Sequence, residues 1–203
     1  AFYKKGYKIN CIYSKTSEHA AVLAQKVKAD VVNDISKINE KSEVYFICVN
    51  DDSIVEIASQ LHVKNQMIFH TSGSIEMNIL KSISKNFGVF YPLQTFTKDS
   101  LLDFTEIPIC LEASNSSTLN SATELAKDLS INVIELNSEQ RKEIHLAAVF
   151  ANNFTNHMYV MAEDILQKNK IPFSILLPLI KQTAFRLQTG NSPKDFQTGP
   201  AIR

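Results

Sequence analysis

Ser14, Lys15 and Thr16 place two hydroxyls and an ammonium directly after the first apolar segment of the chain. In a dinucleotide-binding fold, the end of the second strand meets the adenine ribose. An acid there selects NAD, and cationic or hydroxyl residues accommodate the extra phosphate of NADP. No acid stands at this position, so these residues predict an NADP phosphate site. The alternative is a solvated turn that caps the next helix.

Asn50 and Asp51 follow a second apolar segment, residues 44–49. If that segment is a strand of the same sheet, its carboxyl end opens on the same cleft, and both side chains are candidates for cofactor binding. Helix capping explains the same residues without a ligand, because Asp52 or Ser53 could cap a helix that starts here.

A third apolar segment ends at His70, and Thr71 and Ser72 follow it in a small polar loop. Histidine can act as an acid or a base near neutral pH. Together with Gln94, which follows a later apolar segment, these residues are predicted to line the substrate cleft. The alternative is a histidine that is hydrogen-bonded into a turn.

His145 and Asn153 are polar candidates in a long helical segment with many apolar residues. At about 100° per residue they are about 80° apart around a helix, so they can share one face. Burying such groups without partners costs a few kcal/mol, so this face should meet a cleft, another chain or solvent. His145 is the candidate general acid, and Asn153 is the candidate for orienting the substrate. No histidine and carboxylate pair has HExxH-like spacing, so no metal site is predicted.

Short apolar strands alternate with helices in the first two thirds of the chain. Strands are predicted over 7–13, 31–32, 44–49, 66–70, 89–91, 107–111 and 133–136, and helices over 17–28, 53–61, 76–84 and 117–129. Helical crossovers between buried strands specify an α/β fold with a doubly wound parallel sheet. Its ligands sit at the carboxyl ends of the strands, which points to the loops after Tyr13, Val49 and His70.

The pattern becomes purely helical at Asn137. Asn137 and Gln140 form a capping-box pattern, and no proline or glycine interrupts the helical pattern from there to Lys170. A second helix is predicted over 172–187, and Pro178 inside it predicts a kink or a break.

This change divides the chain into an α/β domain, 1–136, and an all-helical domain, 137–203. Residues 1–6 are predicted to be the end of a helix that Gly6 caps. We therefore expect the first strand and the Gly-rich loop of the dinucleotide fold to precede this sequence, and the C-terminus to be truncated.

The composition is that of a globular protein, since 44% of the 203 residues are apolar and 21 basic residues balance 21 acidic ones. No net charge attracts nucleic acid or an anionic membrane, which favours a small-molecule partner. Cys11, Cys48 and Cys110 are too far apart for a CxxC motif, which predicts reduced core thiols and a cytoplasmic location. No apolar run reaches the roughly 20 residues that span a bilayer.

Five motifs occur together in one order along the chain. They are SKT at 14–16, HTSGS at 70–74, VFYPLQTF at 89–96, HLAAVFANNF at 145–154 and TGPAIR at 198–203. Together they resemble a family of NADP-dependent oxidoreductases with a Rossmann-like N-terminal domain and an all-helical C-terminal domain. That family is similar in plan to the 6-phosphogluconate, 3-hydroxyisobutyrate, ketopantoate and pyrroline-5-carboxylate reductase group. The resemblance covers nearly the whole chain.

The resemblance implies NADP as cofactor, hydride transfer to or from a carbonyl or imine carbon of a small molecule, and a homodimer formed by the helical domains. In the better-known relatives, a lysine and an asparagine on the first helix of the second domain bind substrate and help proton transfer. The matching helix here presents His145 and Asn153 instead. A non-catalytic nucleotide-binding or scaffold dimer is the alternative, because a fold does not by itself imply a reaction.

Overall fold

The computed structural model describes residues 1–38, 42–97, 102–190 and 192–198. It contains two compact units, Ala1–Ala148 and Val149–Arg203, which are described separately below. The units divide inside the long helical segment that starts after residue 136. The domain boundary expected at residue 136 stays a prediction.

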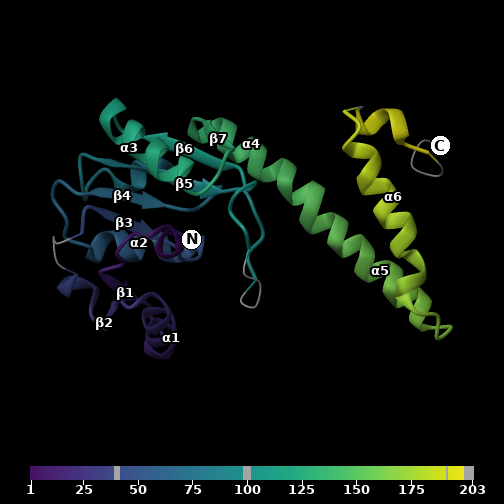
Figure 1. Ribbon diagram of the computed structural model, residues 1–203, viewed down its shortest axis with the longest axis horizontal. Coiled ribbons are helices and arrows are strands. Elements are labelled where there is room, and N and C mark those ends of the chain that lie inside the picture. Colours follow the sequence, from purple (N-terminus) through teal and green to yellow (C-terminus); the bar gives the residue numbers. More distant parts are fainter. Residues whose placement is uncertain (39–41, 98–101, 191, 199–203) are drawn as a thin grey trace. The chain divides into compact units, whose positions relative to one another are not determined.

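The first unit is an α/β structure, as predicted (Figure 1). Its strands are β1 (Cys11–Tyr13), β2 (Asp30–Val32), β3 (Val44–Ile47), β4 (Met67–His70), β5 (Phe87–Pro92), β6 (Ile109–Ala113) and β7 (Val133–Glu135). Its helices are α1 (Ser17–Val27), α2 (Asp51–Gln60), α3 (Ser116–Lys127) and α4 (Ser138–Ala148), with short 3-10 helices η1 (Phe2–Lys5), η2 (Ile35–Lys37) and η3 (Met77–Leu80). Gly6 ends η1 in the left-handed conformation, as the sequence predicts.

The strands form two sheets, one of β1 and β2 and one in the order β3-β4-β5-β6-β7. All neighbours are parallel except β5 and β6, which are antiparallel. The predicted parallel sheet is therefore confirmed except at this one antiparallel pair. Parallel neighbours need a crossover, usually a helix. The described part of the 93–108 connection contains no helix, and the chain returns antiparallel to β5.

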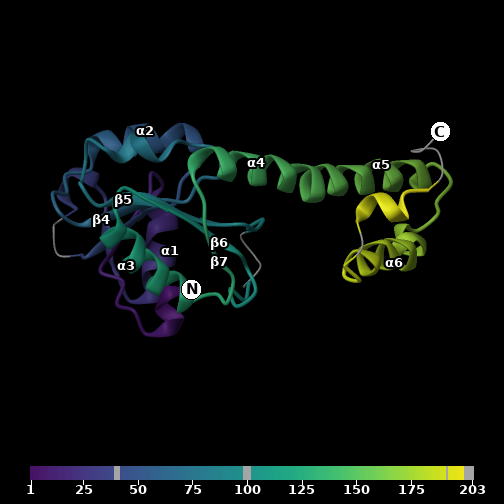
Figure 2. The ribbon, with the colours of Figure 1, turned by 90° about the horizontal axis from the view of Figure 1, so that it is seen from above.

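Successive residues of the central strands supply two hydrophobic cores, one on each face of the larger sheet. In β4, Ile68 belongs to the core with Ile54 of α2, and Phe69 belongs to the core with Ala122 of α3. Figure 2 shows α2 on one side of the sheet and α3 on the other. This alternation places Val89 and Tyr91 of β5 in a further cluster with Cys110.

The predicted helix over 76–84 is wrong, because the chain forms only the single turn η3 there. Serine side chains compete with helical hydrogen bonding by binding nearby backbone groups. The Ser84 hydroxyl donates to the Gln66 carbonyl at 2.7 Å and accepts from the Asn86 N–H at 3.1 Å. These bonds hold residues 84–86 in a turn. The crossover between β4 and β5 therefore contains one 3-10 turn in place of a full helix.

The three cysteines are free, but their environments differ. Cys110 is buried and Cys11 is partly buried. Cys48 is exposed, because it follows the last residue of β3, where the chain leaves the sheet. The prediction of a core thiol is therefore wrong for Cys48.

The helix that starts after Asn137 has the predicted capping box. The Asn137 N–H donates to Gln140 Oε1 at 3.0 Å, and the Gln140 N–H donates to Asn137 Oδ1 at 2.9 Å. The two bonds satisfy N–H groups that would otherwise lack partners at the start of α4. The sequence thus predicts this helix start correctly.

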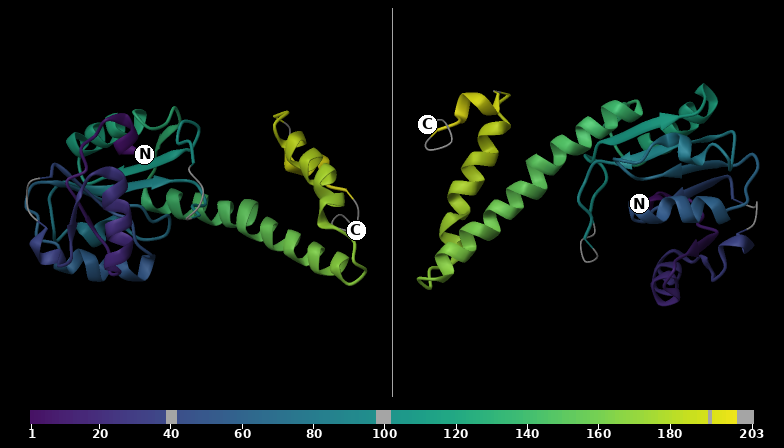
Figure 3. Two further views of the ribbon diagram at one scale, coloured as in Figure 1. Left: turned by 60° about the horizontal axis from the view of Figure 1, so that its bottom comes forward. Right: turned by 180° about the vertical axis from the view of Figure 1, so that it is seen from behind.

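The second unit is entirely helical in its described part. It comprises the π-helix η4 (Val149–Phe154), α5 (Thr155–Gln167), η5 (Phe173–Leu176), α6 (Leu177–Leu187) and η6 (Pro193–Phe196). Pro178 lies in the first turn of α6, where the 3-10 turn gives way to an α-helix, so the predicted break occurs. Figures 1 and 3 show α5 and α6 diverging from the turn between them.

No described residue of the second unit is buried. Many of its large apolar side chains are instead exposed; they are Phe150, Phe154, Met158, Val160, Met161, Ile165, Ile171, Ile175, Leu177, Leu179, Phe185 and Leu187. This unit has no core of its own in the chain as described. None of the helices in the described ranges is long and apolar enough to cross a membrane.

Candidate functional site

The carboxyl ends of β3, β4 and β5 lie at one edge of the larger sheet, because these neighbouring strands are parallel. Two hydrogen bonds join the end of β3 and the start of α2 to the loop that follows β4. The Ser74 hydroxyl donates to Asp51, and the Thr71 hydroxyl donates to the Ile47 carbonyl at 3.5 Å. Asp51 is therefore tied to Ser74, and Thr71 is tied to the last residue of β3 at the same edge.

Asn50 is the N-cap residue of α2, so neither Asp52 nor Ser53 caps this helix. Its side chain makes no capping hydrogen bond and is exposed. The amide of Asn50 is therefore available to a ligand.

Ser14, Lys15 and Thr16 follow β1, and Thr16 is the N-cap residue of α1 without a capping bond from its side chain. The Thr16 N–H donates to Ser14 Oγ at 3.3 Å. Lys15 Nζ lies 2.6 Å from Glu56 Oε2, with both side chains about half exposed. An exposed pair of this kind contributes roughly 0–1 kcal/mol, so Lys15 can exchange Glu56 for an anionic ligand at little cost.

His70 is fully buried and does not line an open cleft, which corrects its assignment as a substrate-lining residue. The Ser72 N–H donates to His70 Nδ1 at 3.2 Å, so the imidazole is built into the turn. Burial, and to a smaller extent the positive charge of Arg141, lowers the pKa of His70 from its ordinary value of 6.5 to about 4. The imidazole is neutral near pH 7 and is no proton donor there.

Ser72 is also used structurally. Its hydroxyl accepts from the backbone N–H groups of Ser74 and Ile75, each at 3.1 Å. Gln94 is exposed, and its Oε1 accepts from the Thr95 N–H at 2.9 Å. Nothing in the described structure brings Gln94 to the other predicted residues of the site.

Tyr91 and His145 form a pair that the sequence does not reveal. The Tyr91 hydroxyl lies 3.0 Å from His145 Nδ1, and the two rings meet edge to face with centroids 6.0 Å apart. Gly73 packs directly against both side chains. A Cβ atom on it would lie 2.6 Å from His145 Nδ1 and 2.8 Å from Tyr91 Cζ, so only glycine fits beside the pair.

Burial raises the pKa of Tyr91, so its hydroxyl is protonated and can donate a hydrogen bond. His145 itself is partly exposed. The pair thus joins a buried phenol to an imidazole that reaches the surface. A partly exposed imidazole held in this way can exchange a proton with a ligand.

Arg141 is a second feature that the sequence analysis missed. It lies one helical turn before His145 on α4 and is buried. It donates to the carboxylate of Glu112, to the carbonyl of Ile75 and, at 3.2 Å, to Ser138 Oγ. These contacts fix the first turns of α4 against β6 and against the loop that carries Gly73.

Asn153 lies in the π-helix, in the other compact unit, and its side chain is exposed. Its predicted role beside His145 stays a prediction. Within the described ranges, no three histidine, cysteine or acidic side chains are grouped so that they could hold a metal ion. Of the TGPAIR motif, residues 199–203 lie outside the described residues.

Comparison with solved structures yields a strong match. A protein of Bacteroides fragilis described as a "putative NADP oxidoreductase" is 42% identical, with a TM-score of 0.89, over 99% of this chain and 78% of that chain. The chain belongs to the same oxidoreductase family. The resemblance inferred from the five motifs is thereby confirmed.

Residues 107–203 of this oxidoreductase match a family model described as a domain of unknown function, DUF2520. A protein of Thermotoga maritima is 25% identical, with a TM-score of 0.75, over 98% of this chain and 78% of that chain. A pyrroline-5-carboxylate reductase of Streptococcus pyogenes shares the fold, with 14% identity and a TM-score of 0.70 over 98% of this chain and 80% of that chain. None of the curated proteins matches the sequence.

The environment of His70 predicts an acid-sensitive step in the stability of the oxidoreductase. The pKa of His70 is about 4 in the folded protein and about 6.5 in the unfolded chain. Below pH 6.5 the unfolded chain therefore binds the proton more readily than the folded protein does. This contribution to stability is present above pH 6.5 and is lost as the pH falls toward 4. Between pH 7 and 4.5 the loss should be about 2–3 kcal/mol.

Urea unfolding of the parent protein and of His70→Asn at both pH values measures this loss. Asparagine keeps an acceptor for the Ser72 N–H but does not titrate, so the variant should lose about 2–3 kcal/mol less on acidification. His19→Asn, at an exposed position of α1, is the control and should follow the parent. Equal pH dependence in the parent and in His70→Asn would contradict the prediction.

Proposed function

We propose that this chain binds NADP at the carboxyl edge of its sheet and transfers hydride between the nicotinamide and a carbonyl or imine carbon of a small molecule. The 42% identity to the Bacteroides fragilis protein over 99% of the chain carries the proposal. The Tyr91–His145 pair supports it, because reduction of a carbonyl or imine also requires a proton.

The exposed donors after β1 fit the 2′-phosphate of NADP. Ser14, Lys15 and Thr16 offer hydroxyl and ammonium groups, and no carboxylate stands among the three. Asn50 offers an amide at the start of α2, the helix to which Lys15 is paired through Glu56. Asp51 is instead bonded to Ser74 and holds that loop in place. NADP would supply the hydride, and the protein supplies position and electrostatics.

His145 is the proposed general acid, and Tyr91 is the residue that positions it. In the imidazolium form of His145, Nδ1–H donates to the Tyr91 hydroxyl oxygen, and Nε2 carries the second proton. Nε2 hands this proton to the carbonyl oxygen or imine nitrogen as hydride reduces the carbon, which leaves a neutral imidazole with its proton on Nδ1. Asn153 is the proposed residue for orienting the substrate, and Thr71, Ser72 and Gln94 are proposed to line its cleft.

Several solved structures that share only the fold indicate probes for a substrate screen. An imine reductase of Myxococcus stipitatus was solved with NADP+, and a reductive aminase of Aspergillus terreus with cyclohexanone and allyl amine. They are 14% and 13% identical to this chain. Cyclic ketones, amines and cyclic imines are therefore the first compounds to test with NADPH.

We also propose that the protein is a cytoplasmic homodimer formed through the helical unit. The exposed apolar side chains of α5 and α6 form no core within that unit. Apolar surface of this extent marks a contact with another chain or segment. A second copy of this chain is the partner implied by the family. A catalytically inactive nucleotide-binding or scaffold dimer is the rival, and the absence of turnover with every carbonyl and imine tested would favour it.

The cofactor assignment predicts tighter binding of NADPH than of NADH to the full protein. Replacing Ser14, Lys15 and Thr16 with alanine should weaken NADPH binding at least about tenfold, because hydrogen bonds to charged groups contribute about 1.5–3 kcal/mol each. NADH lacks the 2′-phosphate and is the internal control, so its affinity should not change. Calorimetric titration measures both, and failure to bind either nucleotide would overturn the oxidoreductase proposal.

The proton-donor assignment predicts that His145→Gln slows reduction about 10²-fold or more while the Kd for NADPH stays within about twofold. Tyr91→Phe keeps the imidazole but removes the bond that fixes its tautomer, so its turnover should fall less, by about tenfold. His19→Gln is the matched control and should behave as the parent. NADPH oxidation followed at 340 nm measures the rates, and unchanged turnover in His145→Gln would remove this residue from the mechanism.

The homodimer predicts that charge on the apolar face of α5 separates the copies. Ile165→Glu, at a side chain 62% exposed in the single chain, should shift the full protein from twice its chain mass to one chain mass. Val55→Glu, at a position of α2 that is 56% exposed, is the control and should leave the mass unchanged. Light scattering after size-exclusion chromatography measures the masses, and a parent protein that is monomeric at micromolar concentration would exclude the dimer.

A further inference from the structure

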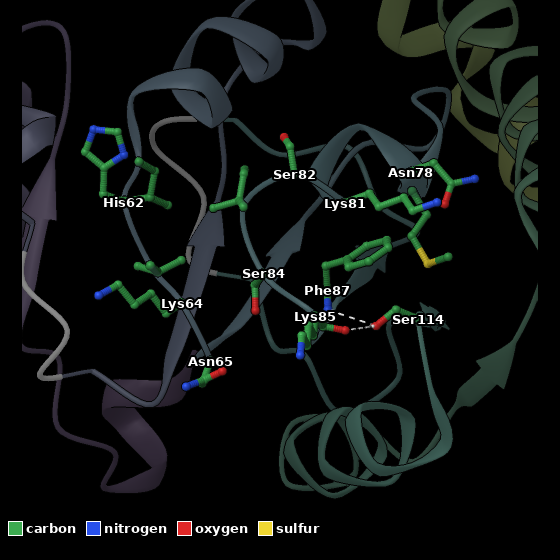
Figure 4. Close-up of a pocket in the computed structure, with 14 residues that line it drawn as sticks. His62, Lys64, Asn65, Asn78, Lys81, Ser82, Ser84, Lys85, Phe87 and Ser114 are labelled. Atoms are coloured by element: carbon green, nitrogen blue, oxygen red, sulfur yellow. Dashed lines mark hydrogen bonds between the residues drawn. The ribbon is translucent and has the colours of Figure 1, made fainter.

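A hollow of about 1110 Å³ lies at the edge of the sheet opposite to the proposed reaction site (Figure 4). Its walls come from residues 61–65, which precede β4, and residues 81–85, which precede β5. Ser114 closes one side from the end of β6, whose antiparallel direction brings its carboxyl end to this edge. The hollow therefore lies at the amino ends of β4 and β5.

The lack of a full helix in the crossover between β4 and β5 accounts for the hollow. Only the one-turn helix η3 crosses there, and Met77 and Asn78 of that turn line the space. A full crossover helix packs along its whole length against the sheet. Here the remaining residues of the crossover run in turns around the space instead of filling it.

Side-chain hydrogen bonds fasten the three walls to one another. Ser84 donates to the Gln66 carbonyl at 2.7 Å, and the Asn86 amide donates to the Asn65 carbonyl at 2.7 Å. The Ser114 hydroxyl donates to the Lys85 carbonyl at 2.7 Å and accepts from the Phe87 N–H at 3.1 Å (Figure 4). The frame is therefore fixed before any ligand arrives, which reduces the entropy lost on binding.

The charged side chains that line the hollow are all basic. Lys64 comes from one wall and Lys81 and Lys85 from another, and His62 adds an imidazole. No carboxylate lines the space, and none of the three lysines forms an ion pair with a described residue. In a chain whose total charges balance, this is a local concentration of positive charge that an anion would neutralise.

We propose that this basic groove binds a small phosphorylated molecule, at a site separate from the one where the hydride is transferred. Ammonium groups on flexible stems bind phosphate oxygens as point charges from several directions. The volume exceeds that of one phosphate and lies slightly above the range of about 300–1,000 Å³ that is typical of small-molecule pockets. The side chains of Met77 and Ile83 add apolar wall, so the ligand carries an organic part beside its phosphates.

Inorganic pyrophosphate is the first probe, since it tests phosphate recognition without a base or sugar that the NADP site could bind. Its addition to the full protein should change the backbone amide NMR shifts of residues 62–65 and 81–85. Residues 14–16 can shift as well, because they are proposed to bind the cofactor phosphate, and saturating NADPH should remove only those shifts. Shifts only at 14–16 would overturn the groove proposal and leave the cofactor proposal standing.

The variant with Lys64, Lys81 and Lys85 each changed to Gln should bind pyrophosphate at least about tenfold more weakly. The matched control changes the exposed Lys8, Lys26 and Lys127 to Gln, which alters the net charge equally and should leave the affinity unchanged. An equal loss in both variants would show attraction by net charge only and would overturn the proposal.

Two further measurements characterise the ligand. Raising the ionic strength from 0.05 to 0.5 M should weaken binding several-fold, because it shortens the screening length from about 14 Å to about 4 Å. A nucleoside diphosphate and a sugar phosphate, titrated with NADPH already saturating, separate nucleotides from other phosphorylated molecules. Tighter binding of polyglutamate than of any phosphate compound would assign the groove to an acidic protein and overturn the proposal.

Discussion

The buried ion pair between Arg141 and Glu112 is the interaction on which the candidate site depends. It joins the start of α4 to β6, and a second guanidinium bond holds the carbonyl of Ile75. Breaking a buried pair by removing one partner typically costs 3–5 kcal/mol, because the remaining charge lacks compensation. His145 lies one turn further along the same helix, so the guanidinium that anchors α4 also sets where the imidazole meets Tyr91. Its charge also helps to keep His70 neutral.

Close packing at this edge leaves each residue little freedom. Gly73 must lack a side chain, because any Cβ atom would enter the space of His145 and Tyr91. The Ser72 hydroxyl accepts hydrogen bonds from two backbone N–H groups. These bonds shape the loop so that Gly73 can lie against His145 and Tyr91. The proposed proton donor is thus held by a tyrosine on a strand, a glycine in a loop and an arginine on its own helix. Such support from rigid elements is what catalysis requires of a positioned group.

The sequence predicts those features that rest on local patterns. Short apolar runs locate the seven strands of the described residues, and reciprocal capping at Asn137 and Gln140 locates the start of α4. It does not reveal the antiparallel return at β6, because strand direction depends on a connection without a regular pattern. Tyr91 and Arg141 escape detection for a similar reason, since their partners are 54 and 29 residues away. His70 was placed correctly at a strand end, but its burial depends on side chains from several elements.

The connection between β4 and β5 links the two edges of the sheet. Its first residues, 71–75, form the loop against Tyr91 and His145, and its last residues, 81–85, form a wall of the basic groove. Between them, Arg141 holds the Ile75 carbonyl, and Met77 packs beside Val89 and Tyr91 while also lining the groove. A ligand that contacts Met77 and residues 81–85 therefore touches the same connection whose first residues hold the proposed proton donor. Few packed residues join the groove to the site at His145. Ligand binding in the groove therefore affects that site by as much as the ligand favours one arrangement of these residues over another.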